Sequence, residues 1–121
     1  MDKGDIPRVH KVWCAVDCGV AVNPDVIRAQ MQGGIGFGLG HVLFAEVTVD
    51  AGRPLQSNFD TYRSLRIDEM PEIEVTIVPS AEKPTGVGEP GVPPIGPAVA
   101  NAMARLGLGR PRRLPMVRGT G

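Results

Sequence analysis

The chain has 121 residues with 13 basic and 13 acidic side chains, and its formal net charge of zero gives no electrostatic footprint for nucleic acid or an anionic membrane surface. This length predicts one domain with a modest hydrophobic core. No apolar run approaches the length needed to span a bilayer, and the N-terminus lacks the apolar core of a signal peptide. As written, the chain is therefore expected to be cytoplasmic or a piece of a longer protein.

The cysteines and histidines offer little for metal binding. Cys14 and Cys18 have neither C-x-x-C spacing nor a second pair. His10 and His41 lack a partnered spacing to these cysteines or to each other. We therefore expect two free thiols and no metal held directly by side chains of this chain.

Residues 9–17 combine alternation with β-branched and aromatic residues and end at Cys18-Gly19, which predicts a strand followed by a turn. Asn23 and Pro24 then mark the start of a helix, because asparagine caps helices well and proline is best tolerated in the first turn. Apolar residues recur at helical spacing after this start, namely Ile27, Met31, Ile35 and Val42. A first long helix with one face against the core is therefore expected.

The middle of the chain predicts a hairpin and one further strand. Residues 44–50 alternate, residues 51–54 have the composition of a turn, and residues 55–59 follow as the second strand of the hairpin. Residues 60–71 are polar and irregular, and residues 72–78 alternate again.

A second helix is expected to begin at Pro97 and to end at Gly107, with a stripe formed by Val99, Met103 and Leu106. Strands and helices mix without the strict alternation of a doubly wound sheet. The sequence therefore predicts an α+β fold, with a small mixed or antiparallel sheet and two main helices packed on one face. It leaves the order of the strands open.

The stretch QGGIGFGLG, residues 32–40, lies inside the first predicted helix. Each of its five glycines costs about 1 kcal/mol relative to alanine, so the run costs on the order of 5 kcal/mol, comparable with the stability of a small domain. Close approach of another backbone or of a ligand must offset this cost. Packing explains Gly34 and Gly38, which lie one turn apart on a single face, and fits the remaining glycines badly.

Familiar nucleotide-binding motifs do not explain the glycine run, which matches neither a dinucleotide fingerprint nor a phosphate loop. Gln30 at its edge both donates and accepts hydrogen bonds, as recognition of a heterocycle with mixed donor and acceptor edges requires. A solvated helix residue is the equal alternative for this glutamine.

The stretch TGVGEPGVPPIGP, residues 85–97, holds one ionisable side chain, Glu89. Its prolines fix φ and bias the preceding residues toward extended geometry, so the loop is expected to be stiff without being hydrogen-bonded. A rigid cradle with few side chains suits a general base, because misplacement by about 1 Å can cost on the order of 100-fold in rate. An exposed loop glutamate without a role is the alternative.

Three stretches occur in order: VDCGVAVNPDVIRAQMQGGIGFGLG, LRIDEMPEIEVTIVPS and GVGEPGVPPIGPAVANA. Together they resemble the C-terminal part of the molybdopterin-binding large subunit of the xanthine dehydrogenase and aldehyde oxidase family. Within that family, the chain is most similar to the isoquinoline 1-oxidoreductase beta-subunit branch. The resemblance covers about residues 9–115, and the ordered set of three motifs is far more specific than any one of them.

The resemblance implies a catalytic role for Glu89, as the general base that deprotonates a molybdenum-bound hydroxyl. The oxygen then attacks an electron-poor carbon of a small N-heterocycle or aldehyde substrate, while hydride passes to a sulfido ligand. The resemblance also implies that Val87 and Gly88 lie beside the metal, because they precede Glu89 in the family motif.

The resemblance further implies that Gln30 hydrogen-bonds the pterin of a molybdenum-molybdopterin cofactor, with Gly33 and Gly34 following it as the family pattern expects. The chain departs from the pattern at two positions. Gln32 stands where related sequences often have an acidic residue, and Phe37 stands where many have glutamine.

Related large subunits are several times longer, so the resemblance implies that residues 9–115 are a C-terminal molybdopterin-binding domain, with residues 1–8 as a flexible arm and residues 116–121 as a flexible tail. The remainder of the large subunit would complete the site, and the chain alone is expected to hold no molybdenum stably and to oxidise nothing. Two cysteines cannot hold an iron-sulfur cluster, so a separate iron-sulfur subunit is expected as electron acceptor. Apolar surface meant for absent neighbours favours self-association of the fragment. An export signal outside this sequence would make the enzyme periplasmic.

The competing hypothesis is a non-catalytic α+β interaction module. Its glycine-rich helix packs on a partner chain, and its Glu89 is merely solvated. This hypothesis predicts that glycine substitutions weaken assembly and that changes at Glu89 are silent.

Overall fold

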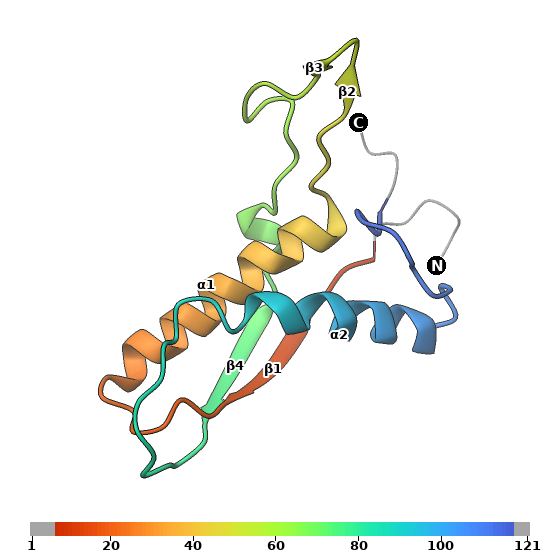
Figure 1. Cartoon of the computed structure of the whole chain (residues 1–121). Helices are drawn as coiled ribbons and strands as arrows, with labels where there is room; N and C mark the ends of the chain where they lie inside the picture. Colours follow the sequence, from red (N-terminus) through yellow and green to blue (C-terminus); the bar gives the residue numbers. More distant parts are fainter. Residues whose placement is uncertain (1–6, 118–121) are drawn as a thin grey trace.

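The computed structural model describes residues 7–117 (Figure 1). Two long helices and two strands form the body, and a thin hairpin extends from it. The elements in chain order are β1 (Lys11–Val16), α1 (Pro24–Leu43), β2 (Val49–Asp50), β3 (Arg53–Pro54), the short 3-10 helix η1 (Ile67–Glu69), β4 (Glu72–Ile77) and α2 (Val92–Arg105).

The body is built around a parallel pair of strands, β1 and β4, in register from Lys11↔Glu72 to Val16↔Ile77. Alternate residues Val12 and Cys14 of β1 turn toward the helices, whereas Trp13 between them is exposed. The α+β class is thus confirmed, as are two helices on one face of the sheet. Parallel and antiparallel pairs occur in two separate two-stranded sheets and not in one sheet. The parallel order follows from the long α1 crossover, which carries the chain back to the same end of the sheet.

The predicted start of α1 is confirmed. Asn23 has extended backbone geometry and its Oδ1 accepts a hydrogen bond from Val26 N at 3.2 Å, while Pro24 occupies the first helical position. The predicted apolar residues Ile27, Met31 and Ile35 are buried. The helix therefore begins where its cap and its proline place it.

The predicted start of α2 at Pro97 is wrong, because the helix begins five residues earlier, at Val92. Pro93 and Pro94 fit the first turn, where backbone N–H groups need no helical partner. Ile95, which the prediction left outside the helix, is buried and starts the apolar stripe that continues in the predicted Val99 and Met103. Pro97 thus lies in the interior of the helix.

The end of α2 at Gly107 is confirmed. This residue has a φ of +76°, a conformation that glycine adopts without strain. Leu108 N donates to Met103 O at 3.0 Å and Gly107 N donates to Ala104 O at 3.2 Å, as in a Schellman motif.

The hairpin is confirmed, but its strands are much shorter than predicted. The predicted second strand, residues 55–59, is wrong. Leu55 N still donates to Thr48 O at 2.9 Å, but the next ladder position is taken by the side chain of Gln56, whose Oε1 accepts from Thr48 N at 2.7 Å. Since the hairpin stands away from the β1–β4 pair (Figure 1), no neighbouring strand extends it.

The core consists of two clusters that share Cys14 at their border. In one cluster, the C-terminal half of α1 packs against α2. In the other, the N-terminal half of α1 packs on the C-terminal ends of β1 and β4. Met116 N donates to Val42 O at 2.7 Å and Val117 N donates to Leu43 O at 3.2 Å. Both residues, expected in a flexible tail, thus lie against the end of α1. The remainder of the expected tail, residues 118–121, and most of the expected arm lie outside the described residues.

No helix within residues 7–117 has both the length and the apolar character needed to cross a membrane.

Candidate functional site

The structure joins Gln30 of α1 to the loop that precedes Glu89. Gln30 is half-buried, and its Nε2 donates to Val87 O at 3.4 Å and to Gly88 O at 3.2 Å. Two carbonyl acceptors fix the orientation of the amide, because the flipped amide would place its oxygen against both carbonyls. The side chain of Gln30 is therefore tied to the loop, and three predicted site residues lie together.

The same loop is held a second time, by the turn that follows β1. Thr85 N donates to Cys18 O at 2.9 Å, and Val20 N donates to Glu82 O at 3.0 Å. The expectation of a loop without hydrogen bonds is thus wrong. Its stiffness comes from contacts with α1 and with the β1–α1 turn as well as from its prolines. Figure 1 shows this loop, between β4 and α2, passing beside the first part of α1.

Val87 anchors the loop through its side chain. It is half-buried and packs against the cluster formed by Val16, Cys18, Ile27 and Met31. Gly88, the next residue, has no heavy atom within 4 Å of an added Cβ, so the space beside its backbone is open. The loop therefore turns from the core to an open surface just before Glu89.

Glu89 lies three residues before the first residue of α2. Its carbonyl oxygen accepts from Val92 N at 3.0 Å, while its side chain is exposed and makes no hydrogen bond or ion pair with the rest of residues 7–117. It does not line any of five cavities that the structure forms within residues 7–117. The structure thus presents an uncommitted carboxylate on an anchored backbone.

Three glycines of α1 are explained by close packing. An added Cβ at Gly38 would lie 2.7 Å from Ile95 Cγ2 and 2.9 Å from Val92 O. At Gly34, an added Cβ would make only ordinary contacts, at 3.5–3.6 Å, with Val92 and Gly91. Packing on the opposite side was not foreseen: Gly36 and Gly40 lie against Met70 and Leu65, which belong to the segment before β4.

Gly33 differs from the other glycines of the run, since nothing lies within 4 Å of an added Cβ. It lines a cavity of about 580 Å³ between α1 and residues 62–70. The aromatic pair of Phe37 and His41, with ring centroids 4.3 Å apart, lies on the same wall. The predicted site residues therefore divide, with Gln30, Gly34, Val87, Gly88 and Glu89 near the loop and Gly33 facing this cavity.

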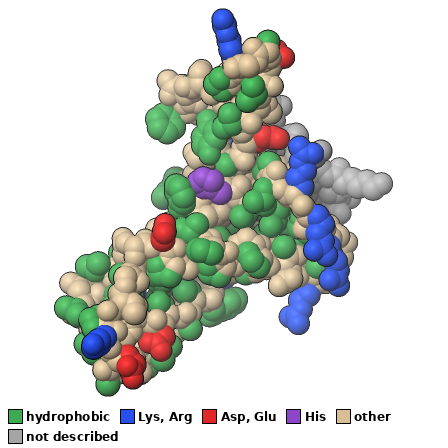
Figure 2. All heavy atoms as spheres, viewed as in Figure 1, with side chains coloured by type: hydrophobic (Ala, Val, Ile, Leu, Met, Phe, Trp, Pro, Cys, Tyr) green, Lys and Arg blue, Asp and Glu red, His purple; other side chains and the backbone are tan. Residues whose placement is uncertain are grey.

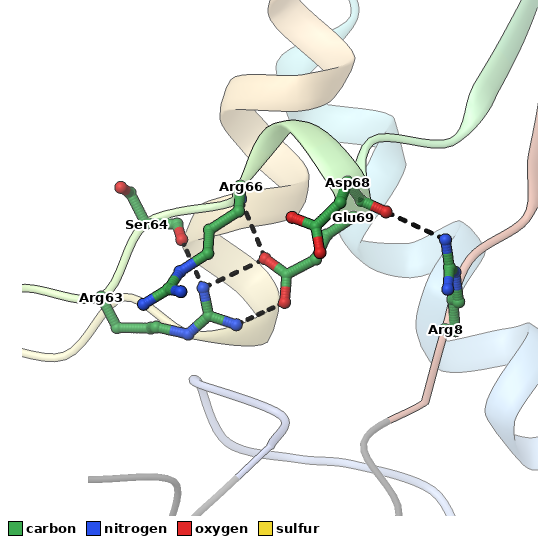
Figure 3. A network of polar contacts seen from close by, with 6 residues as sticks. All are labelled: Arg8, Arg63, Ser64, Arg66, Asp68 and Glu69. Carbon is green, nitrogen blue, oxygen red and sulfur yellow. Dashed lines mark hydrogen bonds and ion pairs between the residues drawn. The ribbon is translucent and has the colours of Figure 1, made fainter.

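A polar network holds the opposite wall of that cavity (Figure 3). The guanidinium of Arg63 makes a two-pronged ion pair with Glu69, and Arg66 N donates to Glu69 Oε2 at 2.9 Å. The hydrogen bond from Arg63 is the main cause that holds the pKa of Glu69 below its usual range. Arg8 donates to Asp68 O at 2.9 Å and ties the segment to the chain before β1.

The thiols are free, with Cys18 buried and Cys14 half-buried. Burial raises the pKa of the Cys14 thiol, which makes it a poor nucleophile. Within residues 7–117, no group of three histidine, cysteine or acidic side chains gathers as metal ligands would. The chemistry of the site thus rests on the amide, the backbone and the carboxylate of the loop.

Sequence reasoning missed the anchors of the loop. Gly19 has a φ of +73° and lets Lys83 O approach so closely that an added Cβ would lie 2.3 Å from it. The Cys18-Gly19 turn was predicted correctly, but nothing in the sequence pairs it with residues more than 60 positions away. The same holds for the bonds from Gln30.

An anchored, side-chain-poor backbone beside an amide and a free carboxylate suits an organic cofactor better than a bare metal ion. The model of the molybdopterin cofactor-binding domain matches residues 2–71 of the chain. The chain belongs to this family. The matched segment includes Gln30, Gly33 and Gly34 and ends before the loop of Glu89.

Individual relatives carry the similarity through that loop. The chain is 44% identical over 108 residues to isoquinoline 1-oxidoreductase subunit beta from Brevundimonas diminuta. The aligned region covers 89% of this chain and 14% of the relative. The chain is 41% identical over 107 residues to a protein of Gluconacetobacter polyoxogenes named membrane-bound aldehyde dehydrogenase (pyrroloquinoline-quinone), covering 88% of this chain and 14% of that protein. The crystal structure of Cu,Mo-CO dehydrogenase superposes with a TM-score of 0.68 at 27% identity, over 85% of this chain and 14% of the other. The chain thus spans about one seventh of these proteins.

Proposed function

We propose that the chain is part of a molybdenum hydroxylase that oxidises a small N-heterocycle or aldehyde with an oxygen derived from water. In this proposal, Glu89 is the general base, and Gln30, Gly33, Gly34, Val87 and Gly88 belong to the cofactor site. The observation that carries the proposal is the pair of hydrogen bonds from Gln30 to Val87 O and Gly88 O, which unites the amide with the loop of the carboxylate.

The residues present suit a pterin cofactor. Because Nε2 of Gln30 is used by the loop, its Oε1 remains as an acceptor for an N–H group of a heterocycle. Open space lies beside Gly33 and, separately, beside Gly88, and at each position a bulky planar group can approach the backbone where a side chain would obstruct it. Gly34 lies on the side of α1 that faces Gly91 and Val92, which follow Glu89 in the chain.

The cofactor, when bound, supplies two-electron redox chemistry and activates water. This chain supplies the proton acceptor. Glu89 makes no ion pair within residues 7–117, so its oxygens are available to take the proton from the water-derived nucleophile. A base on a tethered loop loses little orientational freedom in the transition state, which is what makes positioning effective.

The names of the relatives support the substrate class, since one is an isoquinoline oxidoreductase and another an aldehyde dehydrogenase. Pyrroloquinoline quinone in the second name is the alternative cofactor. The molybdopterin family match over residues 2–71 and the molybdenum in the name of the structural neighbour favour molybdenum-molybdopterin.

The proposal places the chain within a larger assembly. Most of the length of its relatives has no counterpart here, so the remainder of the large subunit is assigned the rest of the cofactor and substrate sites. Large apolar side chains stand exposed on the hairpin and after it, among them Val49, Leu55, Phe59 and Ile67. Figure 2 shows apolar side chains over this part of the surface, where a neighbouring domain would cover them. A separate iron-sulfur subunit is assigned the role of electron acceptor.

The test is Glu89→Gln in the longer subunit that contains this segment, with Glu46→Gln as the matched control. Glu46 is also exposed, and it lies after α1, outside the loop. The proposal predicts unchanged molybdenum and pterin content and a loss of turnover of about 10²- to 10⁴-fold for Glu89→Gln alone. Turnover within a few-fold of the parent would refute the general base and favour the non-catalytic module. Quinone in place of pterin on chemical analysis would refute the cofactor.

A further inference from the structure

The position of Glu89 depends on a stretch with no regular structure. Between the end of β4 and the start of α2, the chain is irregular apart from bends and a turn. A loop of this length samples many conformations unless specific contacts hold it. The contacts that the structure provides are the hydrogen bonds to the β1–α1 turn and the two hydrogen bonds from Gln30.

We propose that Gln30 and Gly19 are positioning residues that clamp the loop of Glu89 at two points and thereby set where its carboxylate lies. This inference rests on the proposed function of Glu89 as general base. It goes further, because it assigns Gln30 a role toward the loop that is independent of contact with a cofactor, and it assigns a role to Gly19.

The clamp at Gly19 is steric. With φ at +73°, this residue turns the chain after β1 so that Val20 N reaches Glu82 O and Cys18 O receives Thr85 N. Asp17 Oδ1 accepts from Gly19 N at 3.1 Å and stabilises the turn. An alanine here would be strained, and its Cβ would lie 2.3 Å from Lys83 O and 2.8 Å from Glu82 O. The backbone of the loop would have to move outward.

The clamp at Gln30 is polar. Its two acceptors, Val87 O and Gly88 O, are the carbonyls of the two residues before Glu89, so its hold acts within one or two residues of the base. The substitution Gln30→Glu keeps the length of the side chain and an acceptor oxygen for a cofactor. It replaces the donor with an oxygen that repels both carbonyls. This change separates tethering of the loop from binding of a heterocycle.

The experiment compares Gln30→Glu and Gly19→Ala in the longer subunit with Gly52→Ala as the matched control. Gly52, in the hairpin, has a similar φ of +78° but nothing within 4 Å of an added Cβ. The control therefore carries the same backbone strain without touching the loop. Amide hydrogen exchange, followed by mass spectrometry of peptides from residues 79–92, measures the hold on the loop directly and does not depend on activity.

For both test variants, we expect exchange in residues 79–92 to accelerate about tenfold, the change that corresponds to losing about one hydrogen bond. We expect kcat to fall about 10- to 100-fold, as for a slightly misplaced base, with KM changed less than about threefold. Gly52→Ala is expected to change neither.

Two outcomes would overturn the inference while leaving the proposed function intact. The first is unaltered exchange in residues 79–92 for both variants. If the pterin content of Gln30→Glu then fell, Gln30 would be assigned to the cofactor alone. The second is faster exchange with unchanged kcat in Gly19→Ala, which would show that the position of the loop does not matter to turnover. Failure of the proposed function itself is recognised separately, by full turnover in Glu89→Gln.

Discussion

Alanine at Gly33 and alanine at Gly38 make the same chemical change twice on α1, yet we expect them to shift the free energy of unfolding in opposite directions. In a helix interior, alanine is favoured over glycine by about 1 kcal/mol. At Gly33 the new Cβ meets nothing within 4 Å, so the chain keeps the whole gain. For a domain of this size, the gain corresponds to a rise in Tm of about 3–5 °C.

At Gly38 the new Cβ would lie 2.7 Å from Ile95 Cγ2 and 2.9 Å from Val92 O, well inside ordinary contact distances. Ile95 is buried and Val92 O is part of the backbone of α2, so neither rotates away freely. The two helices must separate locally, and overpacking of this kind costs about 1–3 kcal/mol. After the gain in helix propensity is subtracted, a net loss of about 1–2 kcal/mol is expected.

Urea unfolding followed by circular dichroism at 222 nm measures both changes, and an unchanged m-value shows that only stability has altered. Gly36→Ala is the intermediate case, because its Cβ would meet the flexible end of Met70 and a result near zero is expected. Shifts of the same sign for Gly33→Ala and Gly38→Ala would refute the account of the glycine run. In the longer subunit, Gly33→Ala should also lower pterin content despite stabilising the fold, since the proposal places the cofactor beside it.

Three further outcomes follow from the structure. Because Arg63 lowers the pKa of Glu69, their ion pair stabilises the fold above the ordinary pKa of a glutamate, about 4.3, and this stabilisation is lost as the pH falls further. Glu69→Gln should therefore reduce the loss of stability in acid by about 0.5–1 kcal/mol, measured by urea unfolding at a series of pH values. Pro97→Ala should stabilise the chain by about 1–3 kcal/mol in urea unfolding, since it restores an N–H group to the interior of α2 at an exposed position. Cys14 is half-buried, and burial raises the pKa of its thiol. Alkylation of Cys14 by iodoacetamide at pH 8 should therefore be at least about fivefold slower in the folded chain than in the urea-unfolded chain. Equal rates would contradict the burial of this thiol.

The predictions that succeeded rest on signals that lie close together in the sequence. Asn23 and Pro24 define the start of α1 within two residues, and Gly107 defines the end of α2 by its own backbone conformation. The start of α2 failed for an informative reason. Proline is common in the first turn, and Pro93 and Pro94 fit that position better than Pro97. The burial of Ile95, which places the start of the helix before Pro97, is a tertiary property.

The candidate site was foreseen in its parts and not in its arrangement. Gln30 stands at the edge of an unusual glycine run, and Glu89 is the one ionisable side chain of a loop rich in glycine and proline. The contact between α1 and the loop, however, joins residues 57 and 58 positions apart. No periodicity or turn signal encodes such a separation. The same limit applies to Gly36 and Gly40, whose partners lie in a polar segment that the sequence describes only as irregular.

The contacts that hold the loop lie entirely within this chain, whereas most of what the loop is proposed to serve lies outside it. Val87 is half-buried against the chain's own core and Gln30 belongs to α1, so the backbone before Glu89 is held without a cofactor or a neighbouring domain. A base that is preorganised in this way need not be ordered when the cofactor binds, which preserves binding free energy for the transition state. Under the proposed function, an exposed Glu89 is expected, because the proposal assigns the partner of this carboxylate to the remainder of the subunit.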